Sequence, residues 1–231
     1  MADLSNWSGC SLPERRLIEG RYVRLEPLDA ARHGDGLFAV LTMSDADQRF
    51  RFLPDMPPRS RAEFQPWLER AQASTETWFF TVIDLASDCV AGRQALMRID
   101  AANGVIEIGH ILWSAIIARQ RAATEAFYLF ARHVFADLGY RRLEWKCNDE
   151  NEPSKRAALR FGMRFEGVFR QHLVVKGANR NTAWFSMIDK EWPRNRAAFE
   201  AWLLPENFDR EGRQIRSLSE IRDAIQAEGV V

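Results

Sequence analysis

In seven segments of the chain, apolar and polar residues alternate or apolar residues run together between turn signals. Alternation with a period of two is typical of half-buried strands, and short apolar runs bounded by turns are typical of buried ones. We therefore predict strands at 21–26, 78–83, 90–99, 105–113, 143–147, 165–175 and 182–189. Short turns join the second, third and fourth strands into an antiparallel meander, and a turn at 176–179 joins the last two into a hairpin.

Helical periodicity fills most of the intervals between these strands. Apolar residues recur every three or four positions from Ala123 to Leu138, and Gly139 then ends that helix. Ser60 and Ser217 each precede a glutamate by three residues, which is typical of a capping box at a helix start. Helices are thus expected after Ser60 and at 29–43, 123–138, 151–162, 191–204 and 217–228. The order of elements predicts an α+β (mixed α/β) domain.

The length and composition fit one large folded domain, or one domain with an appendage. The 231 residues are 46% hydrophobic and 28% charged, and 32 basic side chains balance 32 acidic ones. This balance argues against a general nucleic-acid or membrane-surface binder, which usually carries a basic excess. Three dispersed cysteines suit a reducing compartment, and the first residues lack the pattern of a secretion signal. We expect a cytoplasmic protein with no nucleic-acid or membrane partner.

Several well-defined catalytic motifs do not occur in the sequence. HExxH, CxxC, GxSxG and GxxxxGK[ST] are all missing, and the four histidines are scattered. The dinucleotide fingerprint GxGxxG is missing as well. The sequence therefore argues against a zinc hydrolase, an elbow-type serine hydrolase, a P-loop enzyme and a Rossmann nucleotide site, and we expect no metal.

The junction between the strand at 105–113 and the following helix is the strongest chemical feature. It combines two arginines with small residues at a helix start: Arg119, Gln120, Arg121, Ala122, Ala123 and Thr124. The unpaired N–H groups and the positive dipole end of a helix favour a phosphate at such a position. An ordinary capped helix with two solvated arginines is the alternative interpretation.

Two further candidates come from neighbouring strands. Asn151 and Ser154 follow the strand at 143–147, where they form either a plain helix cap or part of a ligand site. Glu107 lies in the strand that leads to the arginine-rich junction. Its carboxylate could act as a general base, directly or through water, or could simply face solvent.

Taken together, these stretches resemble the GNAT superfamily of acetyl-CoA-dependent N-acetyltransferases, and most closely its ribosomal-protein N-terminal acetyltransferase (Rim-type) branch. The motifs ATEA, NxxS, FGM and FEGVFR are weak singly and specific in their common order. The matching segments are 20–28, 106–113, 119–126, 135–145, 151–162, 165–170 and 182–192. The resemblance implies an acyl-CoA N-acyltransferase domain at 17–192, between a loose lead-in at 1–16 and a helical extension at 193–231.

The resemblance also implies a strongly twisted, mostly antiparallel sheet flanked by helices, with a helical C-terminal tail. The fourth and fifth predicted strands would splay apart to hold acetyl-CoA. Leu112 and Trp113 would offer backbone groups to the pantetheine arm, and residues 119–124 would cradle the pyrophosphate. The chain departs from the family's usual Gln/Arg-x-x-Gly-x-Gly/Ala loop at Ala118 and Arg121.

The implied reaction is direct attack of a primary amine on acetyl-CoA in a ternary complex. Glu107 or a water chain would take the amine proton, and a backbone N–H near Trp113 would stabilise the oxyanion. Asn151 would contact the pantetheine end, and Ser154 would protonate the departing thiolate. A covalent relay through Cys147, a preference for longer acyl chains and a catalytically silent acyl-CoA-binding module remain as alternatives.

The acceptor stays open at this level, as a small-molecule or peptide amine. The segment 50–58, rich in aromatic residues and prolines, and the turn 176–179 are expected to form the acceptor-side walls. Apolar residues in the extension allow either a monomer or a homodimer.

Overall fold

The computed structural model describes residues 3–227 and contains one eight-stranded sheet. The strand order is β1-β2-β3-β4-β5-β6-β8-β7, and every neighbouring pair is antiparallel except β5 and β6. The strands are β1 (Ile18–Glu19), β2 (Val23–Pro27), β3 (Thr77–Asp84), β4 (Cys89–Asp100), β5 (Val105–Trp113), β6 (Arg142–Asn148), β7 (Arg164–Val175) and β8 (Ala178–Ile188). The predicted mixed, mostly antiparallel fold is confirmed.

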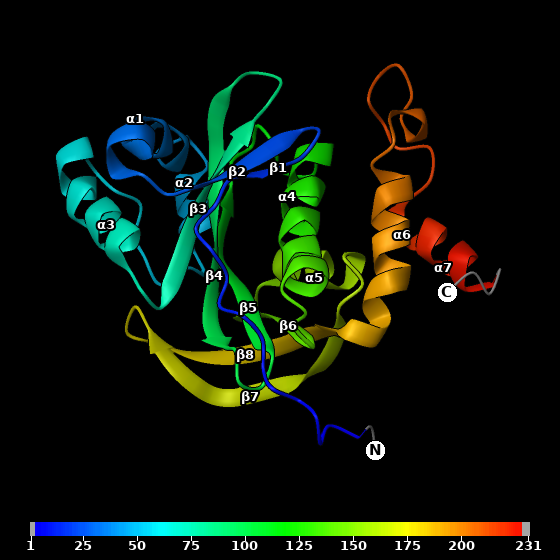
Figure 1. Cartoon of the computed structure of the whole chain (residues 1–231). Helices are drawn as coiled ribbons and strands as arrows, with labels where there is room; N and C mark the ends of the chain where they lie inside the picture. Colours follow the sequence, from blue (N-terminus) through cyan, green and yellow to red (C-terminus); the bar gives the residue numbers. More distant parts are fainter. Residues whose placement is uncertain (1–2, 228–231) are drawn as a thin grey trace.

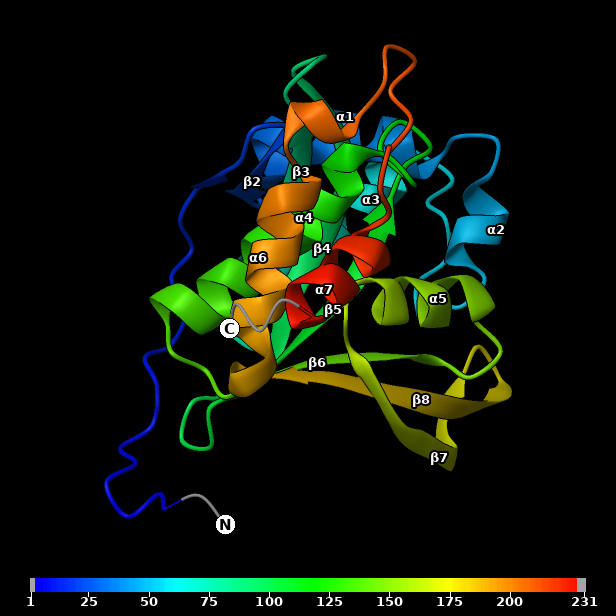
Figure 2. The ribbon, with the colours of Figure 1, turned by 90° about the vertical axis from the view of Figure 1, so that its right-hand side faces the viewer.

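Helices cover both faces of this sheet (Figure 1). The first three lie on one face and α4 and α6 lie on the other, while Figure 2 shows α7 against α6. The helices are α1 (Ala30–Leu41), α2 (Ala46–Phe50), α3 (Arg61–Ala73), α4 (Arg121–Arg132), α5 (Glu152–Arg160), α6 (Trp192–Trp202) and α7 (Leu218–Ala227). A π-helical turn, His133–Asp137, continues α4. No helix within residues 3–227 is long and apolar enough to cross a bilayer.

The predicted elements match this arrangement with small shifts. All seven predicted strands and six predicted helices are present, and the strand at 105–113 has the predicted bounds. Two short elements, β1 and α2, were not predicted, and their few residues give little periodicity. Glu228, the predicted end of the last helix, lies outside the described residues.

Hydrophobic cores lie on the two faces of the sheet. The larger one packs α4 against the sheet and takes in the C-terminal segment through Trp192, Phe199, Trp202 and Leu203. The smaller one lies under α1 and α3. The C-terminal extension therefore shares the main core instead of forming one of its own.

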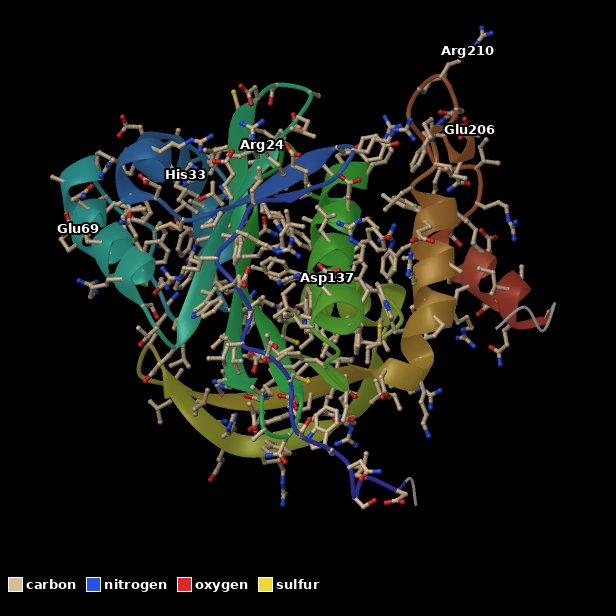
Figure 3. The ribbon with its side chains drawn as sticks, viewed as in Figure 1. Arg24, His33, Glu69, Asp137, Glu206 and Arg210 are labelled. Atoms are coloured by element: carbon tan, nitrogen blue, oxygen red, sulfur yellow. The ribbon has the colours of Figure 1, made fainter. Side chains whose placement is uncertain are left out.

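The N-terminal lead-in makes specific contacts with the folded domain. The indole Nε1 of Trp7 donates to the carbonyl oxygen of Ala102 (2.7 Å), beside the β4–β5 turn. Arg16 pairs with Asp137 (2.7 Å), which is labelled in Figure 3 at the end of the helical segment that follows α4. These two contacts fix the path of the lead-in across the domain.

The parallel pair β5–β6 is short. Only Val105, Ile106 and Glu107 pair with β6, opposite Arg142, Leu143 and Glu144. Beyond that point β5 stays with β4, and all seven residues of β6 pair with β8. The two strands consequently part in the middle of the sheet, as the resemblance implied for the fourth and fifth predicted strands.

Glu125 of α4 fastens the β1–β2 turn to the helix. This carboxylate is 4% exposed and accepts hydrogen bonds from the backbone N–H groups of Arg21 (2.8 Å), Tyr22 (2.6 Å) and Val23 (2.8 Å). A Cβ on Gly20 would lie 2.5 Å from the same carboxylate, so the close approach requires glycine. The contact fixes β2 relative to the start of α4.

We predict that Glu125→Gln lowers the free energy of unfolding by about 2–3 kcal/mol. The amide NH₂ would face a buried backbone N–H and leave it unpaired. Urea unfolding of both proteins measures the difference. Glu76→Gln, a change at an exposed position, serves as the control and should stay within about 0.5 kcal/mol of the parent. Equally small effects of the two changes would contradict the role given to Glu125.

Candidate active site

A cavity of about 310 Å³ lies where β5 and β6 part. β5 contributes Glu107 and His110 to its lining, and the start of α5 contributes Asn151 and Ser154. β4 and β6 contribute further residues, among them Arg98, Lys146 and Cys147. The rest of the wall comes from the end of α2 with the segment after it and from the β7–β8 hairpin: Arg49, Phe52, Leu53, Pro54, Leu173, Val175 and Arg180. Side chains from six separate parts of the chain thus converge on one cavity.

The two segments expected as acceptor-side walls meet at this cavity. Lys176, in the hairpin turn, donates a hydrogen bond from Nζ to the carbonyl oxygen of Phe50 (2.8 Å). This bond joins the hairpin to the segment that follows α2. The lining residues are neighbours of the turn 176–179, however, and not the turn itself.

Two β-bulges shape the wall around Glu107. The β4–β5 register shifts on either side of it, and a non-glycine residue takes a positive φ in each shifted stretch: Arg98 (46°) and His110 (50°). A positive φ is strained for a residue with a Cβ, and a bulge redirects the side chain. The bulges bring Arg98 and His110 to the same cavity as Glu107.

Glu107 is 3% exposed and is held from one side by two cations. Its Oε2 lies 2.6 Å from Nη1 of Arg98 and 2.8 Å from Nζ of Lys146. Lys146 also contacts Glu144 (2.7 Å) and lies 3.8 Å from the ring centre of Trp184. Within the described part of the chain, Oε1 accepts no hydrogen bond, so it is the carboxylate oxygen left for a ligand.

Asn151 and Ser154 form the predicted cap and also face the cavity. Asn151 Oδ1 accepts from the backbone N–H of Ser154 (3.2 Å), which starts α5. The indole of Trp145 donates from Nε1 to Ser154 Oγ (3.0 Å). Because an indole N–H can only donate, Ser154 is left to donate its own O–H elsewhere. The two interpretations of this pair, cap and ligand site, are therefore compatible.

Cys147 lines the same cavity in β6. Burial raises the pKa of the Cys147 thiol, although a hydrogen bond with Ser154 opposes the shift. The thiolate is the nucleophilic form of cysteine. The raised pKa therefore weighs against a covalent relay through Cys147.

His110 is a cavity residue that the sequence analysis did not single out. Its ring centre lies 5.0 Å from that of Phe79, and its buried Nδ1 has no hydrogen-bond partner among residues 3–227. Burial, and then the charge of Arg93, lower the pKa of His110 to about 4, while Asp55 partly opposes them. The imidazole is accordingly neutral near pH 7.

The expected phosphate site lies at the start of α4, beyond the cavity. Gln120 precedes the helix without a side-chain cap, so the first N–H groups remain able to bind an anion. Arg119 is exposed and takes a φ of 63°, whereas Arg121 keeps helical backbone geometry. The guanidinium of Arg121 packs between the rings of Tyr22 (4.8 Å) and Phe208 (4.6 Å). The backbone N–H of Arg121 is thus still available to bind an anion, whereas its guanidinium makes cation–π contacts with the two aromatic rings.

The other residues expected along the cofactor have side chains that point largely inward: Leu112, Trp113, Ala122, Ala123 and Thr124. A ligand at this position would therefore be bound by backbone groups and by the exposed side chains of Arg119 and Gln120. Thr124 Oγ1 accepts from Nη1 of Arg160 (3.0 Å), which ties the first turn of α4 to α5. This arrangement fits a phosphate-bearing group that lies across the start of α4.

The structure thus gathers Glu107, Asn151 and Ser154 in one cavity and sets residues 119–124, the expected phosphate loop, apart from it, past the end of β5. Sequence reasoning missed Arg98, His110, Lys146 and Arg180. Three of these lie next to a bulge or in a hairpin whose register no local pattern reveals. Lys146 could have been found from the sequence, because it lies within the predicted strand at 143–147, next to Cys147.

We predict that folding stability falls as the pH drops from 6.5 towards 4, in part because of His110. Its folded-state pKa of about 4 lies below the unfolded value near 6.5, so the unfolded chain binds the proton first. This difference contributes up to about 3 kcal/mol, fully present above pH 6.5. His110→Gln should flatten the curve within that window, as measured by urea unfolding at several pH values. Parallel curves for variant and parent would contradict the prediction.

Comparisons with known proteins agree with this geometry. A family model described as an acetyltransferase (GNAT) domain matches residues 23–164. A GCN5-related N-acetyltransferase from Brucella melitensis is 61% identical with a TM-score of 0.94, over 95% of this chain and 100% of that one. A structure described as a probable GNAT-family acetyltransferase from Chromobacterium violaceum is 39% identical with a TM-score of 0.78, over 84% and 96%.

A further relative is known from its sequence. An uncharacterized N-acetyltransferase, p20, from Bacillus licheniformis is 29% identical over 117 residues, or 49% of this chain. The match spans 63% of that relative's length. The family model covers more than half of the chain and includes the parted strands β5 and β6 and the start of α4. On this evidence the chain belongs to the GNAT family of acetyltransferases.

Proposed function

We propose that this chain is an N-acetyltransferase that moves an acetyl group from acetyl-CoA to a primary amine by direct attack in a ternary complex. One observation carries the proposal. A carboxylate from β5 and a hydroxyl from α5, Glu107 and Ser154, line a single cavity at the point where the two central strands part. A proton acceptor and a proton donor therefore face the same cavity.

We place acetyl-CoA along the end of β5, from the start of α4 to the cavity. The backbone of Leu112 and Trp113 would hold the pantetheine arm, residues 119–124 would hold the pyrophosphate, and Asn151 would lie at the pantetheine end. The uncapped start of α4 supports the phosphate end of this path. When bound, acetyl-CoA supplies an activated acetyl group that an amine can attack directly.

Glu107 would take the proton from the attacking amine. Its Oε2 is occupied by Arg98 and Lys146, so we assign the proton to Oε1, directly or through one water. Lys146 and Arg98 also place positive charge beside the amine. Nearby positive charge disfavours an ammonium ion, so the surroundings favour the neutral amine that the reaction needs.

Ser154 would deliver a proton to the departing thiolate. The bond from Trp145 orients the hydroxyl, whose own O–H can donate to Cys147 or, with acetyl-CoA bound, to the departing thiolate. A thiolate is a good leaving group, since its conjugate acid has an ordinary pKa of about 8.5, and a weak acid suffices. The backbone N–H near Trp113 is our candidate for stabilising the oxyanion.

The finer assignments are proposals of the same kind. We place the chain near the ribosomal-protein N-terminal acetyltransferase branch because its motifs occur here in the same order. We also propose a cytoplasmic enzyme, either monomer or homodimer. Calorimetric titration with acetyl-CoA and with coenzyme A, followed by a thiol-release screen of amines, tests the function as a whole. Tight binding without turnover of any amine would favour the silent binding module.

We predict that Ser154→Ala lowers kcat about tenfold and leaves acetyl-CoA affinity nearly unchanged, because only the departing thiolate needs the proton. Stopped-time thiol release and calorimetry measure the two quantities. Ser87→Ala, in an exposed turn, is the control. Unchanged kcat in Ser154→Ala would remove the acid role from this residue.

Glu107→Gln should lower kcat/KM about 100-fold and flatten the acid limb of the rate-against-pH profile. Glu144→Gln offers a matched control, because Glu144 pairs with the same Lys146 from the opposite register position and lies outside the cavity lining. If both variants lose the same activity, the loss reflects the ion pairs and not proton transfer. A profile of unchanged shape in Glu107→Gln would place the base elsewhere.

A further inference from the structure

The charges that line the cavity are strongly unequal. Four cationic side chains reach it: Arg49, Arg98, Lys146 and Arg180. Glu107 is the one carboxylate among the lining residues that the structure describes. This imbalance contrasts with the zero formal net charge of the whole chain, so it is a local property of this site.

Three of the four cations have carboxylate partners. Arg98 and Lys146 share Glu107, and Lys146 also contacts Glu144. Arg49 contacts Asp45 at 2.8 Å, yet its Nε and Nη1 are buried without a hydrogen-bond partner in the described chain. Arg49 therefore contributes positive charge to the cavity wall, although these two N–H groups are not exposed to it.

Arg180 differs from the other three. Among residues 3–227 it forms no ion pair with a carboxylate, and its Nε donates a single hydrogen bond to Thr182 Oγ1 (3.3 Å). The side chain is nevertheless half-buried. A half-buried guanidinium with no carboxylate in direct contact is unfavourable, and a carboxylate that binds two of its N–H groups reduces the penalty.

The position of Arg180 separates it from the phosphate end of the cofactor path. It lies in β8, on the hairpin wall with Leu173 and Val175, whereas the phosphate site lies at the start of α4. Glu107 contributes to the electrostatic surroundings of Arg180, so the two groups are close. The unpartnered cation is thus beside the proposed base, at the acceptor end of the cavity.

We propose that the acceptor is a primary amine that carries a carboxylate near its amino group, and that Arg180 binds this carboxylate with Arg49 in support. The inference rests on the proposed function and adds the class of acceptor. The same charges disfavour a polyamine or a polycationic small molecule, because a second ammonium would meet the excess positive charge of the cavity wall. The carboxylate could belong to a free amino acid or to an acidic residue close to a peptide N-terminus.

Matched pairs of amines test this proposal by thiol release. L-alanine against L-alaninamide probes a free amino acid, and the amidated tripeptides Asp-Ala-Ala and Asn-Ala-Ala probe a peptide. In at least one pair the carboxylate member should have a kcat/KM at least tenfold higher than its neutral partner. Arg180→Gln should bring the two members within about twofold. Arg170→Gln removes the same charge from an exposed position in the adjacent strand and should keep the preference.

Which pair shows the preference identifies the source of the carboxylate. Equal rates within both pairs, a preference for the neutral members or for spermidine, or an unchanged preference in Arg180→Gln would overturn the proposal. If acetyl-CoA binds but no amine turns over, the proposed function fails and calorimetry decides the acceptor class separately. N-acetylalanine should then bind the coenzyme A complex at least tenfold more tightly than N-acetylalaninamide, and only in protein that retains Arg180. Equal binding, or no binding of either, would contradict the anion site.

Discussion

The rest of the structure depends on the early separation of β5 from β6. The strands share only three paired residues before each follows a different neighbour. Parallel neighbours in a sheet normally satisfy each other's backbone groups along their length. Here the unpaired stretch of β5 becomes the wall of a cavity, and the start of α5 and the β7–β8 hairpin are positioned by β6 on the other side. The candidate catalytic groups face one another because the sheet opens between them.

The opening imposes local strain that specific contacts offset. Arg98 and His110 hold positive φ angles that residues with a Cβ rarely adopt. Arg98 gains an ion pair with Glu107 in that conformation, and the His110 ring packs at a tilt against Phe79. Strained backbone of this kind persists where surrounding packing determines it, and it concentrates at functional sites. The register shifts between β4 and β5 therefore determine which side chains of the meander reach the cavity.

Local patterns in the sequence were sufficient to predict the secondary-structure elements and part of the candidate site. The strand at 105–113 and the cap at Asn151 follow from period and from cap chemistry, which involve residues close in the chain. Arg121 shows why the rest of the site could not be predicted from the sequence. Its ring partners, Tyr22 and Phe208, lie far away in sequence on either side, so no local pattern could place its guanidinium. The unpaired state of Arg180 likewise depends on which carboxylates the fold brings near it.

Arg160, at the end of α5, connects that helix to α4 and to the two C-terminal helices α6 and α7. It binds Thr124 in α4, packs 4.8 Å from the ring centre of Trp202, and accepts at its carbonyl oxygen from Arg222 of α7 (3.1 Å). The helix that carries Ser154 is thereby braced by residues well past position 164, where the family match stops. The segment matched by the family model is therefore shorter than the segment that packs around the site. Evolutionary divergence in the C-terminal extension can therefore alter the rigidity of the shared site without touching any residue within it.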